Sequence, residues 1–236
     1  MAKASKATGT AVLDIKAELK KRAEGIKDRI QAPSGDSIRV TQDKKFKLPN
    51  GQEGPGPLAL VILDFICVNT FFDRPYKEGD ILPPACMALG QNPKTLVPEA
   101  VSPVKQADSC AECPNNVFGS DGAGKACKNL RLLAVVEDND NPDSPIYLLK
   151  VSPTAIKAFD GYVATIQTQF DSLPVSVVTD VYFDPNLKYG SLRFGNPRPN
   201  PNLAIHFDRI AAATARLGVI PDVSTYTPPP KSGKKK

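Results

Sequence analysis

Four cysteines in the middle of the sequence have the residue type and spacing of a metal site. Cys110 and Cys113 form a CxxC pair, in which a tight turn brings two sulfurs to the same side. Cys127 follows in a glycine-rich stretch, and Cys86 precedes the pair after two prolines. Four thiolates complete the tetrahedral coordination of zinc, so this set predicts a closed, structural Zn²⁺ site.

Two other uses of the same thiols are open. An iron–sulfur cluster also takes four cysteines, and a CxxC pair can serve redox chemistry. The redox pair expects a helix in a βαβ unit, whereas Pro114–Asn116 follows here. The single histidine, His206, is the alternative fourth ligand, although its apolar neighbours favour a packing role. Cys67 lies in an apolar run and is expected to be an inert core thiol.

Residues 119–125 resemble the first seven positions of a phosphate-binding loop. The eighth position should be Ser or Thr, but it is Ala126, and no hydrophobic strand precedes the loop. A nucleotide-binding enzyme is therefore only a third hypothesis. We expect the glycines to wrap a metal knuckle and to present Lys125, Lys128 and Arg131 around it. No Ser–His, Cys–His or acidic pair has a spacing that dictates catalysis, so the prediction is a protein without enzymatic activity.

Cations interleaved with aromatic rings suggest contacts to nucleic acid. Single-strand binding needs positive side chains for the phosphates and flat rings for the bases. The tract around Phe46 is the best example, because its flanking lysines are expected to keep that edge in solvent. Besides the three basic residues named above, the candidate residues are Arg39, Lys44, Lys45, Phe46, Lys47, Arg74, Tyr76, Tyr182, Tyr189 and Arg193.

Hydrophobic periodicity predicts a mixed chain whose body is mainly β. Basic tails are expected at residues 1–10 and 224–236, with a disordered C-terminus. Helices are expected at 11–31, 153–170 and 203–217, with a break at 197–201. Strands are expected at 37–47, 58–72, 130–137, 146–151, 175–183 and 191–194.

The order of these elements predicts an α+β fold with a small, OB-like β-barrel of five or six strands. The core spans residues 36–223, after an N-terminal region at 1–35 and before the tail at 224–236. Residues 73–129 show no periodicity of their own. A segment that long needs another source of order, and a bound metal would supply it.

Charge is concentrated at the two ends of the chain. The net charge is +5, and six lysines lie in the terminal tails, so the body is close to neutral. Basic tails attract phosphates without regard to sequence. No apolar run reaches the roughly 18 residues of a membrane helix, and the N-terminus lacks a secretory pattern. We therefore expect an intracellular protein without a membrane partner.

The cysteine-bearing motifs resemble those of a tailed-phage family associated with single-stranded DNA-binding proteins. The likeness lies in PPACMALG at 83–90, CAECPNNVFGS at 110–120 and GKACKN at 124–129. It implies an OB-type barrel with a zinc-stabilised insertion, found in the cytoplasm of a bacterial host. Such single-strand binders commonly end in an acidic tail, whereas this chain ends in lysines.

The leading hypothesis is sequence-tolerant binding of single-stranded DNA in phage replication or recombination, with partners from those processes. The alternative is a zinc-stabilised protein-interaction or transcription-regulatory module, for example one that binds a polymerase. The near-neutral body favours this alternative.

Overall fold

Two long neighbouring strands form the centre of the fold. The computed structural model describes residues 36–75 and 82–229, and its longest strands are β4 (Leu58–Phe71) and β6 (Lys128–Glu137). They pair antiparallel from Leu60 opposite Glu137 to Thr70 opposite Lys128. Both strands read as almost continuous apolar runs because the sheet is covered on both faces, which leaves little room for alternation.

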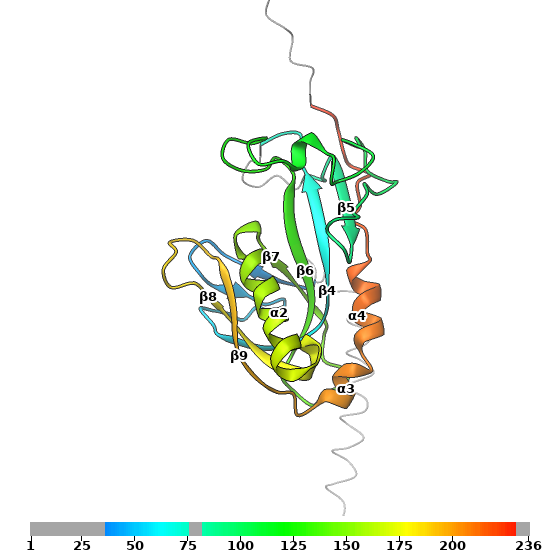
Figure 1. Ribbon diagram of the computed structural model, residues 1–236. Helices are drawn as coiled ribbons and strands as arrows, with labels where there is room; N and C mark the ends of the chain where they lie inside the picture. The colour runs from blue at the N-terminus through cyan, green and yellow to red at the C-terminus, as the bar shows by residue number, and fades with distance from the viewer. Residues whose placement is uncertain (1–35, 76–81, 230–236) are drawn as a thin grey trace, which may run out of the picture. The chain divides into compact units, whose positions relative to one another are not determined.

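A nine-stranded, curled sheet is built outward from this pair in the described part of the chain (Figure 1). Beyond β6, β7 pairs antiparallel and β1 then pairs parallel to β7. Beyond β4, β8 and β9 continue the sheet, while β5 pairs with the far half of β4. The remaining strands are β1 (Ser37–Val40), β2 (Phe46–Lys47), β3 (Glu53–Gly54), β5 (Cys86–Gly90), β7 (Tyr147–Val151), β8 (Val177–Phe183) and β9 (Leu192–Pro199).

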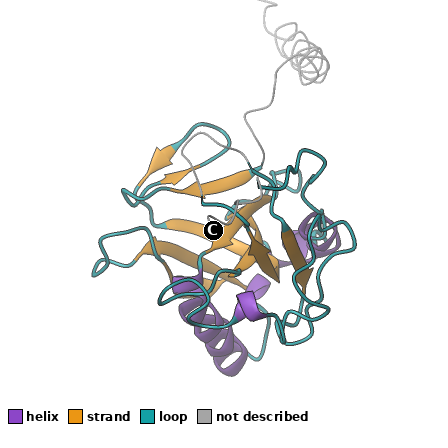
Figure 2. Ribbon diagram, turned by 90° about the horizontal axis from the view of Figure 1, so that it is seen from above, coloured by secondary structure: helices purple, strands orange, loops and turns teal. Residues whose placement is uncertain are grey.

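Helices lie on opposite sides of the sheet and create two hydrophobic cores (Figure 2). Within the curve, α2 (Ile156–Phe170) follows the 3₁₀ turn Pro153–Ala155 and buries Phe159, whose ring meets Phe65 and Phe194 edge-on. Outside it, α4 (Ile210–Leu217) packs on β4 and β6. The short helix α3 (Leu203–Phe207) contacts the 3₁₀ turn Pro174–Ser176. The fold is therefore α+β, with a curled half-barrel sheet.

Side chains, rather than a strand ladder, join the open edges of the curl. The ring of Phe46 stacks on Phe183 at 4.4 Å between centroids, and Lys44 Nζ donates to the carbonyl of Asp184 at 3.0 Å. Gly190 allows this approach, because a Cβ there would stand 2.5 Å from the carbonyl oxygen of Thr41. The β1–β2 hairpin thus meets the β8–β9 turn.

Several predicted elements have different bounds in the structure. The strand expected at 37–47 is the β1–β2 hairpin, which reverses near Lys44 with a φ of 59°. The break expected at 197–201 is wrong, since β9 continues to Pro199; as an edge strand it tolerates proline. The final helix is interrupted between α3 and α4. The sheet also has more strands than predicted, and the helix expected at 11–31 lies outside the described residues.

The far ends of β4 and β6 project beyond the half-barrel and carry residues 82–127, which we call the cysteine module. Its regular elements are β5 and the 3₁₀ turn Pro114–Asn116.

The chain after α4 returns toward this end: Tyr226 donates to Asp73, and Arg74 donates to the carbonyl of Thr227. The tail predicted to be disordered from residue 224 thus begins with contacts to the fold. Among the described residues, no helix is long and apolar enough to cross a bilayer.

Candidate metal centre and its basic surroundings

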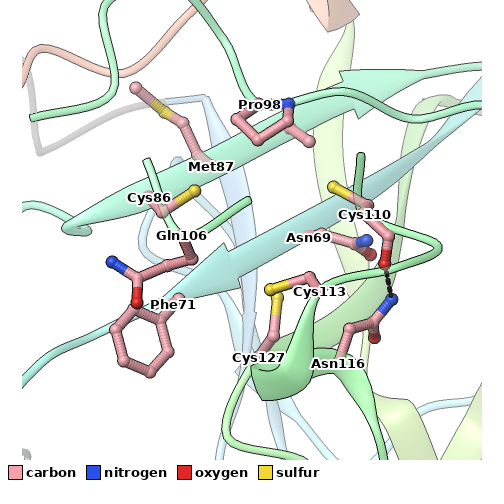
Figure 3. A pocket seen from close by; sticks show the side chains of 11 residues that line it. Asn69, Phe71, Cys86, Met87, Pro98, Gln106, Cys110, Cys113, Asn116 and Cys127 are labelled. Carbon is pink, nitrogen blue, oxygen red and sulfur yellow. Dashed lines mark hydrogen bonds between the residues drawn. The ribbon is translucent and has the colours of Figure 1, made fainter. Parts of the chain in front are cut away.

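The four cysteines of the predicted metal site line one small cavity (Figure 3). Cys86 opens β5, Cys110 and Cys113 lie in the loop after it, and Cys127 immediately precedes β6. Their sulfurs face a common space in the close-up view. The cavity has a volume of about 10 Å³, which is room for one water-sized particle and excludes an organic substrate.

Backbone and amide hydrogen bonds hold the loops that carry these thiols. The turn after the CxxC is fixed by the Asn116 amide donating to the Cys113 carbonyl at 2.9 Å, and Asn116 Nδ2 donates to the Cys110 carbonyl at 2.7 Å. The Cys127 amide donates to the Asn115 carbonyl at 2.7 Å, which ties the start of β6 to the same turn. Asn69 on β4 lines the same cavity, and its side-chain oxygen accepts from Asn129 Nδ2 at 2.6 Å.

Burial and the proximity of other thiols raise the pKa values of Cys110 and Cys127. Burial is the main cause for Cys127, whose pKa rises to about 12, and the nearby Cys110, Cys113 and Cys86 add to it. Burial likewise raises the pKa of Cys110, with Cys86 and Cys113 as further contributors. These thiols hold their protons at neutral pH unless a cation displaces them, which is how thiolate metal sites form.

The residues that line the cavity fit a tetrahedral zinc ion in type, number and enclosure. Within residues 36–75 and 82–229, no group of three or more His, Cys, Asp or Glu side chains meets the geometry of a metal site. All five cysteines are free thiols rather than disulfides. The four thiols that line the cavity are therefore not consumed by disulfide bonds.

The remaining cysteine and the histidine lie away from this cavity. Cys67 on β4 is 2% exposed, and its thiol donates to the Gln91 carbonyl at 3.4 Å. His206 is completely buried in α3 and contacts Asn200 through Nδ1. Neither residue lines the cysteine cavity, so Cys86 is the fourth cysteine there and His206 is a packing residue.

The glycine-rich segment 119–125 forms a tight reversal. The amides of Gly119 and Gly124 donate to Gly124 and Asp121 carbonyls, each at 2.9 Å, and the chain then enters β6. A phosphate-binding loop leads into a helix whose N-terminal amides face the anion. Here a strand follows, so the resemblance to that loop does not extend to its structure.

Two of the predicted nucleic-acid contacts are wrong because the side chains are buried. Phe46 is fully buried within the main core and presents no ring face to a base. Arg131 is 8% exposed and makes a two-pronged contact with Asp160 on α2, through Nε at 3.1 Å and Nη2 at 2.8 Å. Arg131 therefore fixes α2 against β6 rather than meeting a phosphate.

Other predicted contacts surround the β8–β9 turn. The side chain of Asp184 accepts from Arg193, and its carbonyl accepts from Lys44. Tyr189 in this turn is 48% exposed, whereas Tyr182 lies partly covered over Gly195. The turn thus brings two cations and an accessible ring together, although one carboxylate partly neutralises the cations.

The β1–β3 edge and the end of β4 hold a further set. Lys45 and Lys47 both pair with Glu53, at 3.2 and 3.0 Å, while Arg39 lies exposed on β1. Arg74 pairs with Asp73 at 3.3 Å. Tyr76 lies outside the described residues.

The two remaining lysines lie where the cysteine module meets the start of β6. Lys125 Nζ donates to Asn116 and Asn129 side chains at 3.2 and 3.1 Å, and Lys128 pairs with Asp121 at 2.9 Å. Both line a groove that faces the start of α2. The sequence reasoning missed Phe118 and Lys157 on this groove. Phe118 had a signal, namely a large apolar ring in a polar, glycine-rich loop, whereas Lys157 is an ordinary helix lysine.

Comparisons of this chain with known protein families, with curated proteins and with solved structures found no match. The protein is an α+β protein with a curled half-barrel sheet and a four-cysteine cavity at the end of its longest strands.

Proposed function

We propose that this protein binds single-stranded DNA without strong sequence preference, through an OB-type barrel whose first connection is held by zinc. The observation that carries the proposal is the strand order. If β4, β6, β7 and β8 are numbered one to four in chain order, they lie in the sheet in the order four, one, two, three. This is the order of a Greek key. With β9 added as the fifth strand, this order is compatible with the partly open, five-stranded Greek-key barrel of an OB-fold, which supports the proposal.

This strand order assigns roles to two connections. OB-folds bind oligonucleotides with the face of strands two and three and with the loops after strands one and four. Here those loops are the long connection from β4 to β6 and the turn from β8 to β9. Among the residues predicted to contact nucleic acid, Lys125 lies on the first and Tyr189 on the second, while Lys128 opens β6 directly after the first. Single-strand binding requires cations and accessible rings together.

Zinc held by Cys86, Cys110, Cys113 and Cys127 would fix the shape of the first connection. The ion has a structural role in this proposal, because four thiolates leave no open coordination position for chemistry. The resemblance to tailed-phage proteins motivates a role in phage DNA replication or recombination.

A salt titration of oligonucleotide affinity tests the proposal. We expect the purified protein to raise the fluorescence anisotropy of a labelled oligothymidylate of about 16 nucleotides, an upper site size for one OB-fold. The logarithm of affinity should fall linearly with the logarithm of salt concentration, by about 0.7 for each phosphate contacted. A mixed-sequence oligonucleotide should bind within a few-fold, and duplex DNA of equal length more weakly. Absence of binding at low salt would refute the proposal and favour a protein-interaction module.

A further inference from the structure

A groove of about 850 Å³ separates the cysteine module from the start of α2. One wall consists of Phe118 and residues at 124–129, and the other consists of residues at 153–161. Its volume lies within the range of small-molecule sites, unlike the cysteine cavity. Cys127 lines both the groove and the cavity, so the segment that holds the thiol also shapes the groove wall.

We propose that this groove is a binding site for one base of a single strand. The base stacks on the Phe118 ring, and the lysines contact the flanking phosphates. The Phe118 ring is 78% exposed, the most of any large apolar side chain in the described residues. Exposing such a ring gains nothing for folding, whereas base stacking on an aromatic face stabilises single-strand complexes. The inference rests on the proposed function and adds the location and the contacting residues.

The charges around the groove suit a polyanion. Lys125, Lys128 and Lys157 line it, and the Lys125 ammonium lies 5.1 Å from the centre of the Phe118 ring. Cation and ring are therefore presented together, as a nucleotide with adjacent base and phosphate requires. The start of α2 also lines the groove, and the positive end of the helix dipole favours anions there.

The acidic groups nearby are already engaged. Asp160 lines the groove, but its carboxylate already accepts hydrogen bonds from Nε and Nη2 of Arg131. Asp121 pairs with Lys128, yet both side chains are about half exposed or more, at 62% and 48%, and such surface pairs exchange readily for a phosphate contact. The groove therefore keeps a positive surplus. A single strand offers a base for the ring beside each phosphate for the lysines, so it uses both features of the groove at once.

Two variants test this base-binding site in the full-length, metal-loaded chain. Phe118→Ala should weaken oligothymidylate binding about ten-fold at fixed salt, the size of one lost stacked base. Lys157→Gln should reduce the salt slope by about 0.7, as expected for one lost phosphate contact. Matched controls are Phe207→Ala, an exposed ring on α3, and Lys94→Gln, neither of which lines the groove. Both controls should bind like the wild type.

Folding and contact are checked independently. Far-ultraviolet circular dichroism and metal content should match the wild type in all four variants, because the altered side chains are exposed. An oligonucleotide carrying 5-iodouracil should crosslink under ultraviolet light to the peptide that contains Phe118, and this crosslink should be lost in Phe118→Ala.

The outcomes separate this inference from the proposed function. If the wild type binds DNA while Phe118→Ala and Lys157→Gln match their controls, the groove is not the base-binding site and the proposed function stands. If only Lys157→Gln weakens binding, the groove holds an anion without a stacked base, and the inference is overturned. If the wild type binds no oligonucleotide, both proposals fail.

Discussion

The half-barrel body and the cysteine module are stabilised in different ways. The body has a core on each face of its sheet, with large buried side chains such as Phe159 and Leu133 on one face and Val61 and Leu217 on the other. The module shares one small cluster with β4, in which Leu96 is the largest buried side chain. Hydrophobic burial can sustain the body, but the module needs a second source of order.

Part of that order comes from hydrogen bonds to β5. The amide of Glu99 donates to the Met87 carbonyl and that of Val104 to the Ala85 carbonyl, both at 2.8 Å. Ser102 Oγ bonds both the amide and the carbonyl of Met87 at 3.1 Å. The irregular chain is thereby fastened along an edge strand. The four thiols line a cavity beside this segment. We therefore expect metal bound there to decide whether the module stays folded.

Replacing one of the four cavity cysteines should produce the largest difference in stability between the body and the cysteine module. Cys110→Ser and Cys127→Ser should abolish the binding of one zinc equivalent and open residues 91–127 to protease, since structural zinc sites contribute roughly 10 kcal/mol or more. The body should keep its cooperative unfolding. Metal analysis and limited proteolysis provide the readouts, and Cys67→Ser is the control that keeps its metal. A wild-type protein that carries no metal after purification in zinc would contradict the expectation.

A change in the body should produce the opposite pattern. Phe159→Ala removes a fully buried ring that contacts Phe65 at 5.0 Å and Phe194 at 5.1 Å, so we expect a loss of about 3–5 kcal/mol in the free energy of unfolding. Urea denaturation measures this loss, while the folded variant should bind zinc normally. Phe170→Ala, an exposed ring on the same helix, should change stability by less than about 0.5 kcal/mol. Equal effects of the two variants would show that α2 does not anchor the body.

The smallest effect is a pH dependence that belongs to the body. Burial lowers the pKa of His206 from its usual value of 6.5, and the Arg209 charge adds to this, while Asn139 and Asp138 oppose it. The unfolded chain therefore takes up the proton first as pH falls. Stability should be full above about pH 7 and decline below 6.5, with a slope of at most about 1.4 kcal/mol per pH unit.

His206→Gln removes the only histidine, so this slope between pH 7.5 and 5.5 should disappear in urea titrations. The slope should persist in the Cys110→Ser chain, because His206 does not line the cysteine cavity. A slope that vanished with the metal site would show that body and module unfold as one unit.

The sequence predicted the elements whose signal is local. β4 and α2 follow from a long apolar run and a helical period, and the CxxC spacing placed Cys110 beside Cys113. Successive side chains of a strand point to opposite faces, so the Phe46 ring lies inward when Lys45 and Lys47 face solvent. The burial of Phe46 could therefore have been predicted from the sequence.

Other features depend on contacts between distant parts of the chain. Asp160 lies 29 residues from Arg131, and nothing in either segment shows that β6 and α2 would bring the two charges together. The contact of Gly190 with the β1–β2 hairpin likewise cannot be predicted from local periodicity. The positions of Phe118 and Lys157 across one groove likewise depend on how the module sits on the long strands.

The contacts of Tyr226 with Asp73 and of Thr227 with Arg74 join positions 153 residues apart in the sequence. Asp73 and Arg74 directly follow β4, whose far half also pairs with β5. The chain after α4 is therefore fastened to the same strand that supports the cysteine module. A change that loosens the end of β4 would release both segments together.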